Sequence, residues 1–170
     1  MSDPAAVADT APIPEAAPDP FARLRPLESG SSADGIAFVR VPIERAPEAI
    51  RWIREDYGHA RFVDLTCVDR LSREERFELV YLFYSMTEHT WVRVKSRTDA
   101  EAHSITDIVS GANWYEREVF DLFGVRFEGH PDLTRILMPD DWVGHPLRRD
   151  QPLGSEPVDF TATRKVFGRG

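Results

Sequence analysis

The chain has 170 residues, of which 42% are hydrophobic and 29% charged, as is typical of one soluble domain with terminal extensions. Its net charge of −8 argues against a general nucleic-acid-binding protein, because such proteins present a basic surface. Cys67 is the only cysteine, so the chain alone forms no disulfide framework or thiolate cluster; its place in a β-prone run predicts a small core residue. No apolar run reaches the roughly 18 residues of a membrane span, so we expect any membrane attachment to come through a partner.

The first 34 residues are predicted to form a disordered leader. Residues 1–20 are rich in alanine and proline and contain no lysine or arginine, a composition that buries too little apolar surface to offset the entropy of ordering. The stretch has neither the basic start of a secretory signal nor the arginines of a mitochondrial presequence, so we expect a bacterial cytoplasmic protein. The rest divides into a core domain, residues 35–128, and an extended partner-binding tail, residues 129–170.

The first part of the core predicts one helix and several strands. Ile36–Val41 is a short β-prone run, and Ala46–Tyr57 has apolar residues at helical spacing, with Pro47 in its first turn and Gly58 as its stop. Further β-prone runs are Phe62–Val68, Phe77–Tyr84 and Trp91–Lys95. The short links between them indicate antiparallel hairpins.

Two of these runs differ in how their side chains alternate. Phe77–Tyr84 is apolar on both faces, which predicts a central or doubly covered strand. In Trp91–Lys95 two valines alternate with Arg93 and Lys95, so one face of that strand is expected to meet solvent or a partner.

Ser104–Phe123 predicts the second helix. Ser104 and Asp107 resemble a capping box, an apolar stripe runs along the segment, and Gly124 suits the left-handed position after its last turn. The order β-α-β-β-β-α with hairpins predicts the fold class α+β: a two-layer domain with a mainly antiparallel sheet and two helices on one face.

Glu116 falls inside the apolar stripe of this helix. The opposite side carries Arg117, Glu118 and Asp121. A carboxylate in an apolar stripe must be paired, protonated or placed at an interface. Three interpretations are open: a structural ion pair with an arginine such as Arg135, a buried interfacial role, or a catalytic acid or base.

The histidines of the tail favour surface or interface contacts over a metal site. His130 and His145 lie near Asp132, Asp140 and Asp141, but no helix there holds two ligands at i and i+4. The chain also contains no phosphate-binding glycine loop, no dinucleotide fingerprint and no nucleophile elbow.

The rest of the tail predicts recognition. Trp142, Arg148 and Arg149 belong to residue types that dominate interface hot spots. The chain beyond Asp150 again contains basic and aromatic residues, among them Arg164 and Phe167. The alternatives for this end are disorder or ordering against a partner, and we favour the second.

The segment from Glu116 to Asp150 reads EREVFDLFGVRFEGHPDLTRILMPDDWVGHPLRRD. It closely resembles the signature of the C subunit of bacterial NADH:quinone oxidoreductase, respiratory complex I, whose mitochondrial counterpart is the 30 kDa subunit. The upstream stretches FVDLTCVDR, RFELVYLFYS and WVRVK are also similar to that family, so the resemblance spans residues 36–150. His145 stands where an aromatic such as tyrosine is common, and the leader is not part of the family pattern.

The resemblance implies a peripheral-arm subunit with no catalytic, cofactor-binding or metal-binding residues of its own; NADH, FMN, iron–sulfur clusters and quinone belong to the whole complex. It implies packing against the D and B subunits, no nucleic acid, membrane contact only through partners, and a place on the cytoplasmic side of the bacterial inner membrane. The family motif and interface positions are Glu116, Arg117, Glu118, Asp121, Phe123, Gly124, His130, Pro131, Asp132, Arg135, Asp141, Trp142, Gly144, Pro146, Leu147, Arg148, Arg149 and Asp150.

Two rival functions are open. A related membrane-bound hydrogenase, formate hydrogenlyase or reduced-deazaflavin dehydrogenase would use an equivalent subunit. A free-standing enzyme would use Glu116, Glu118 and Asp121 as acid and base groups, although these three do not converge on an ideal helix.

Overall fold

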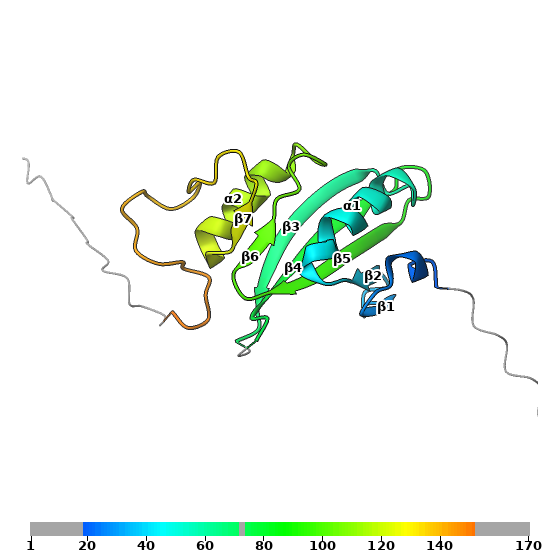
Figure 1. Cartoon of the computed structure of the whole chain (residues 1–170), viewed down its shortest axis with the longest axis horizontal. Coiled ribbons are helices and arrows are strands. Elements are labelled where there is room, and N and C mark those ends of the chain that lie inside the picture. The colour runs from blue at the N-terminus through cyan, green and yellow to red at the C-terminus, as the bar shows by residue number, and fades with distance from the viewer. Residues whose placement is uncertain (1–18, 72–73, 152–170) are drawn as a thin grey trace, which may run out of the picture.

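The computed structural model describes residues 19–71 and 74–151, which form two sheets and two α-helices (Figure 1). The larger sheet has the order β1-β2-β5-β4-β3, with β1 (Glu28–Ser31), β2 (Ala37–Arg40), β3 (Arg61–Asp69), β4 (Phe77–Tyr84) and β5 (Trp91–Thr98). The smaller sheet pairs β6 (Glu101–His103) with β7 (Arg126–Glu128). The helices are α1 (Ala46–Glu55) and α2 (Ala112–Phe123), and two 3-10 turns are η1 (Ala22–Leu24) and η2 (Ile43–Arg45). The predicted α+β class is confirmed.

The central part of the large sheet follows the sequence expectations. β3, β4 and β5 are joined as two antiparallel hairpins, and β4 lies between its two neighbours. β2 pairs in parallel with β5, with Val39 opposite Val94, because the chain crosses over through α1 and the first hairpin before it returns.

The hydrophobic core lies on the helix-bearing face of this sheet. α1 contacts β5 and α2 contacts β3. The buried side chains include Ile50, Ile53, Leu65, Leu79, Tyr81, Phe83, Val92 and Val94. Arg93 and Lys95 alternate with the buried valines and stay half-exposed on the other face, as predicted. That second face is therefore available for further contacts.

The predicted disordered leader of residues 1–34 is wrong for residues 19–34, while residues 1–18 lie outside the described part of the chain. Phe21 and Leu24 are buried, and the ring of Phe21 packs 5.3 Å from that of Tyr57, between centroids. β1 pairs antiparallel with β2 along its whole length. Its sequence ESGS carries no strand signal, so the pairing itself decides its structure.

α2 begins at Ala112 rather than at the predicted Ser104. Residues 101–103 are held extended by parallel pairing with β7, and the N–H of Ser104 donates to the carbonyl of Glu128. Ile105, Ile108 and Val109, which belong to the apolar stripe of the predicted Ser104–Phe123 helix, are buried, but in a separate turn. The Ser104 hydroxyl donates to Glu116, so the predicted capping box is wrong.

α1 confirms the first predicted helix, although it ends at Glu55, two residues before the predicted Tyr57. Pro47 lies in its first turn, and Ile50 and Ile53 form its buried face. Among the helices that the structure describes, none has the length and apolar composition needed to cross a bilayer.

Candidate functional site

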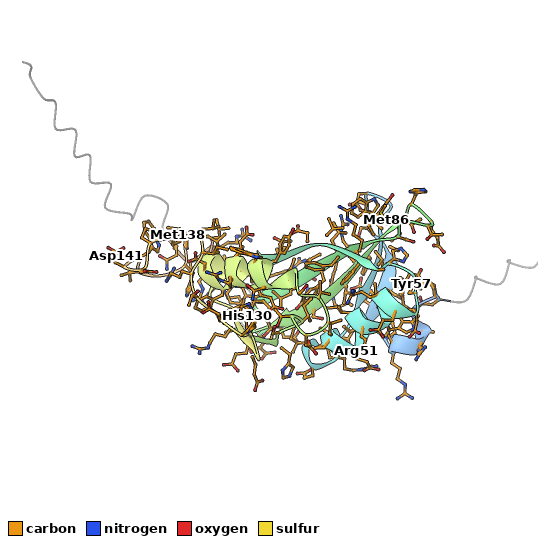
Figure 2. All side chains as sticks on the ribbon, turned by 90° about the horizontal axis from the view of Figure 1, so that it is seen from above. Arg51, Tyr57, Met86, His130, Met138 and Asp141 are labelled. Atoms are coloured by element: carbon orange, nitrogen blue, oxygen red, sulfur yellow. The ribbon has the colours of Figure 1, made fainter. Side chains whose placement is uncertain are left out.

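We refer to residues 129–151 as the strap, since they contain no helix or strand and run along the core domain. Figure 1 shows the strap looping out beyond α2 and returning, and in Figure 2 Met138 and Asp141 lie at the opposite end of the molecule from Tyr57. This agrees with the predicted extended tail as far as Gln151; Arg164 and Phe167 lie outside the described residues. A segment without secondary structure needs other partners for its backbone polar groups.

Asp121 of α2 is the first anchor of the strap. It is fully buried, and its Oδ2 accepts three consecutive backbone N–H groups, from Ile136 at 3.1 Å, Leu137 at 2.8 Å and Met138 at 2.8 Å. Its Oδ1 accepts from Arg135 at 2.8 Å. Burial raises the pKa of Asp121, but these donors outweigh burial and hold the pKa below its ordinary value. Asp121, on the side of α2 predicted to be polar, is thus covered by the strap, whereas Glu118 on the same side stays exposed.

Two arginines hold carbonyl groups of the strap. Arg117 donates from Nε to the carbonyl of Thr134 at 3.0 Å and from Nη2 to that of Arg135 at 2.9 Å. Arg135 donates from Nη2 to the carbonyl of Gly144 at 3.0 Å. A guanidinium has several donors in one plane, so one side chain can bind two acceptors at fixed angles. The core domain therefore binds both N–H groups and carbonyl groups of the strap backbone.

The strap crosses the end of α2 at Gly124. This residue has φ +77°, and its N–H closes the helix on the carbonyl of Phe120, as predicted. The last carbonyls of a helix have no partner within it. Here the strap satisfies three of them: Asp121 by His145 Nδ1 at 2.9 Å, Leu122 by the N–H of Leu147 at 3.0 Å, and Phe123 by Arg148 Nε at 2.6 Å.

Replacing Gly124 with alanine should destabilise the protein by about 2 kcal/mol. A Cβ at this position would lie 2.5 Å from Cδ2 of His145 and 2.6 Å from Nη2 of Arg148, in addition to the unfavourable φ. Urea unfolding measures the loss. Gly129→Ala is the matched control, because Gly129 has φ +81° with no atom near its would-be Cβ. Equal losses in both variants would show that contact with the strap contributes nothing.

Asp69, at the end of β3, is a second buried carboxylate that anchors the strap. It accepts from Arg76 at 2.9 and 2.6 Å, and from the N–H of Arg149 at 2.9 Å. Arg76 also binds Asp150 at 2.7 Å. The hydrogen bonds from Arg76 hold the pKa of Asp69 well below its usual range. Sequence reasoning missed this pair, although both residues lie within the stretches that resemble the family.

Glu116 is fully buried as predicted, but the suggested ion pair with Arg135 is wrong, because Arg135 binds the first anchor instead. Oε1 of Glu116 accepts the N–H of Ile105 at 2.7 Å, and Oε2 accepts the hydroxyl of Ser104 at 2.7 Å. Nε2 of His130 lies 3.9 Å from Oε2. Burial raises the pKa of Glu116 to about 7. This carboxyl therefore ties α2 to the turn after β6.

The strap turns its polar backbone toward the core and several apolar side chains toward solvent. Val143 is 94% exposed, Leu137 60% and Leu147 51%. We call these three residues the apolar rim. Single exposed apolar residues are ordinary, but several within one short segment are typical of an interaction surface.

The residues predicted to contact a partner differ in how far they are exposed. Arg148 binds within its own chain, with its guanidinium 5.4 Å from the centroid of the Phe77 ring, and Trp142 is half-buried. Among the other family motif positions, the half-buried residues include Phe123, Gly144 and Pro146. The exposed ones include Glu118, Pro131, Asp132, Asp141, Arg149 and Asp150. Their role in an interface stays a prediction.

The carboxylates of the enzyme alternative do not converge. Glu116 binds the turn after β6, Asp121 binds the strap, and Glu118 is exposed. Cys67 is a buried core residue, as predicted, and burial raises the pKa of its thiol to about 12. In the part of the chain that the structure describes, no three His, Cys, Asp or Glu residues are grouped so as to hold a metal ion.

Comparison with known proteins confirms the family. The family described as "Respiratory-chain NADH dehydrogenase, 30 Kd subunit" matches residues 39–157, which include the whole strap. The chain belongs to this family. The C subunit of NADH-quinone oxidoreductase from Roseiflexus castenholzii is 44% identical over 140 residues, which cover 79% of this chain and 80% of that protein. The Rhodobacter capsulatus C subunit is 46% identical over 129 residues, which cover 73% and 64%.

One further relative and one solved structure carry other names. The C/D subunit of NADH-quinone oxidoreductase from Methylococcus capsulatus is 42% identical over 134 residues, which cover 72% of this chain and 23% of that protein. Among solved structures, a chain of the membrane-bound sulfane sulfur reductase, an archaeal respiratory membrane complex, is similar with a TM-score of 0.62. It is 28% identical, and the match covers 71% of this chain and 73% of that chain.

Proposed function

We propose that the chain is a non-catalytic peripheral-arm subunit of a proton-translocating NADH:quinone oxidoreductase, on the cytoplasmic side of the bacterial inner membrane. In this role it holds the subunits of the quinone site together while electrons pass from NADH through FMN and iron–sulfur clusters to quinone. The proposal is supported by relatives that bear the name of the C subunit and cover most of this chain.

The strap is the observation that carries the proposal. Its backbone is anchored to two buried carboxylates, Asp121 and Asp69, while the apolar rim faces outward. A segment that served only its own domain would turn apolar side chains inward, because burial of apolar area is the main favourable term. An anchored backbone with exposed apolar side chains is preorganised for a partner and loses less entropy on binding.

The D subunit is the proposed partner of the strap, with the B subunit beside it. The Methylococcus relative, whose name joins C and D, supports this choice, because one polypeptide there carries both names. Fusion of two subunits is structurally simple when they already lie next to each other. On this proposal, NADH, FMN, iron–sulfur clusters and quinone are bound by other subunits, and the chain reaches the membrane only through its partners.

Gentle detergent extraction followed by affinity capture of the chain tests the proposal. We expect an NADH dehydrogenase containing FMN and iron–sulfur clusters to co-purify with the wild-type chain. Recovery of this chain alone would contradict the proposal.

Truncation after Asp150 should leave the domain folded, judged by circular dichroism, and should weaken assembly of the complex.

A point variant in the apolar rim sharpens the same experiment. Val143→Asp places a charge on a 94% exposed side chain, so the fold should persist while capture of the complex falls by about tenfold. Met86→Asp is the matched control, since Met86 is an exposed apolar residue at the other end of the molecule (Figure 2). Equal effects of the two variants would contradict the role of the strap.

A related membrane-bound complex is the second candidate, with the chain as its equivalent subunit. The likeness to a chain of the sulfane sulfur reductase favours it, because that complex is not named an NADH dehydrogenase. The captured complex distinguishes the two: a flavin-containing NADH-oxidising module supports the first candidate, and a hydrogenase-type complex without it supports the second.

A further inference from the structure

The face of the large sheet opposite the helices carries cations around one buried carboxylate. Glu78 of β4 binds Arg40 of β2 at 2.8 Å and also binds Arg70. Nε of Arg97, on β5, approaches the same carboxylate at 3.9 Å. In the sheet register Lys95 lies directly opposite Arg40. We call Arg40, Lys95 and Arg97 the cationic slot.

The cationic slot holds more positive charge than the acids around it neutralise. Arg40 also binds Glu28 of β1, so four cations, Arg40, Arg70, Lys95 and Arg97, lie around the carboxylates of Glu78 and Glu28, with a third carboxylate, Glu75, on the wall of the neighbouring cavity. Within the described residues, Nε of Arg40 and Nε of Arg97 are buried without a hydrogen-bond partner. Burial lowers the pKa of Lys95, and repulsion from Arg40 adds to the effect. A buried donor without a partner is costly, so an anion that reached it would be bound favourably.

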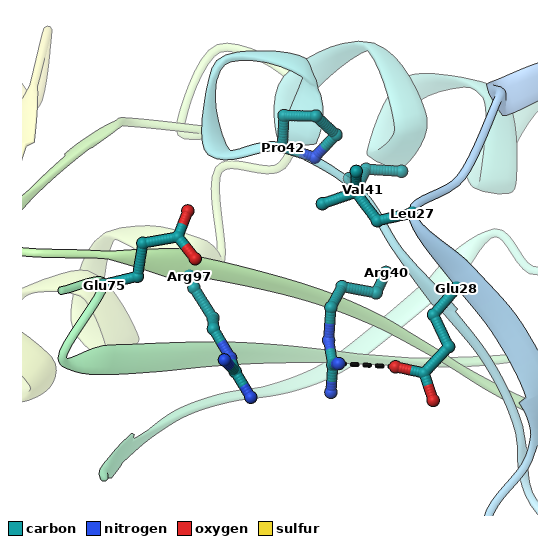
Figure 3. A pocket seen from close by; sticks show the side chains of 7 residues that line it. All are labelled: Leu27, Glu28, Arg40, Val41, Pro42, Glu75 and Arg97. Carbon is teal, nitrogen blue, oxygen red and sulfur yellow. Dashed lines mark hydrogen bonds and ion pairs between the residues drawn. The ribbon is translucent and has the colours of Figure 1, made fainter. Parts of the chain in front are cut away.

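The slot opens to one side. A cavity of about 230 Å³ lies beside it, with Leu27 and Pro42 among its walls. Figure 3 shows that the guanidinium groups of Arg40 and Arg97 point the same way, whereas the carboxylate of Glu75 points away from them. Acceptors from another chain can therefore approach both guanidinium groups from one direction.

An apolar strip adjoins the slot on the same face. Val68 of β3 lies opposite Glu78 and is 42% exposed, and Val80 lies opposite Lys95 and is half-buried. No helix in the described residues packs on this face, since α1 and α2 both lie on the other. β4 carries half-buried Val80, Leu82 and Tyr84 on this face, and a strand that is apolar on both sides is typical of a sheet covered on both.

We propose that this face binds an acidic segment of a neighbouring subunit, with its carboxylates in the cationic slot and its apolar side chains on Val68 and Val80. The inference rests on the proposed membership of a multisubunit complex. Lys95 and Arg97 are about 7 Å apart along β5, so carboxylates at alternate positions of an extended segment match them. An anionic membrane surface fits less well, because such surfaces recruit clusters of at least about four unneutralised Lys or Arg, whereas Glu28 borders this slot.

Photo-crosslinking in the detergent-extracted complex tests the proposal. Benzoylphenylalanine at Val68 should cross-link to a peptide of another subunit that carries carboxylates at alternate positions, identified by mass spectrometry. The same probe at Glu55, exposed on α1, is the control for random contact.

Neutralising the slot with the double variant Lys95→Gln and Arg97→Gln should reduce the cross-linking yield at Val68 by about fivefold. Arg93→Gln is the matched control, because Arg93 is on the same strand and face but is bound by Asp34 at 3.1 and 2.7 Å.

A third probe position separates failure of this inference from failure of the proposed function. Cross-links from Val143 of the strap without any from Val68 would overturn the inference and leave the proposed function standing. Cross-links from neither position would overturn both. Attachment of Val68 to a lipid, to residues 1–18 of this chain, or to a peptide without acidic residues would also overturn the inference. Thermal unfolding of each purified variant shows whether a lost cross-link reflects lost folding.

Discussion

Replacing Asp121 with asparagine should release the strap from α2 and destabilise the protein by about 3 kcal/mol. The carboxylate accepts from Arg135 and from three consecutive backbone N–H groups, and it is fully buried. An asparagine amide brings two donors of its own into a site built of donors. It would also leave the guanidinium of Arg135 without its ion pair.

The stability lost in Asp121→Asn should depend on pH, because the pKa of Asp121 is lowered in the folded protein. A carboxyl whose folded-state pKa lies below the unfolded value contributes stability above the unfolded value of 3.8, and that stability is lost as the pH falls through the folded pKa. The stability difference between wild type and Asp121→Asn should therefore be constant from pH 7 to about 5 and should shrink below about 4.

Urea unfolding combined with hydrogen exchange measures both effects. The amides of Ile136, Leu137 and Met138 should lose most of their protection in the variant, while those of β4 keep theirs. Asp140→Asn, a change at an exposed carboxylate of the strap, is the control and should alter neither quantity. Unchanged protection of residues 136–138 in Asp121→Asn would mean that the strap is held by other contacts.

Elements whose signal lies in their own residues could be predicted from the sequence. α1 shows its helical spacing at Ile50 and Ile53, and β4 shows its apolar run, so both were located to within two residues at each end. β1 and β6 are short and contain few apolar residues. They are stabilised by pairing with β2 and β7, and a pairing between distant segments is not visible in local periodicity.

The polar contacts of the site were also predictable only where the signal lies in neighbouring residues. The burial of Glu116 was predictable, because the helical phase from Ala112 onward is correct even though the predicted start was not. Its partners were not predictable, since they come from a turn whose position depends on β6. The resemblance to the family located the strap but did not indicate that Asp121 and Asp69 hold it. These anchors depend on where the chain returns in space.

Replacing Glu116 with glutamine should leave the protein folded and remove a strong pH dependence of its stability. The pKa of Glu116 is raised from 4.5 to about 7, because burial disfavours the charged form more than its hydrogen bonds from Ile105 and Ser104 favour it. A group whose folded-state pKa is raised contributes stability that is fully present below the unfolded pKa and is lost as the pH rises through the folded pKa. Wild-type stability should thus fall by about 3 kcal/mol from this group between pH 4.5 and 8.

Glutamine can keep both contacts, because its carbonyl accepts the N–H of Ile105 and its amide donates to the hydroxyl of Ser104. The variant should match the wild type near pH 4.5 and exceed it by about 2–3 kcal/mol at pH 8, in urea unfolding series over that range. His130, whose Nε2 lies 3.9 Å from Oε2 of Glu116, is present in both proteins, so the difference between their curves isolates Glu116. Glu118→Gln, at an exposed position of the same helix, should leave the curve unchanged. Parallel curves for wild type and Glu116→Gln would show that Glu116 is ionised throughout, and unfolding of the variant would show that the fold requires its charge.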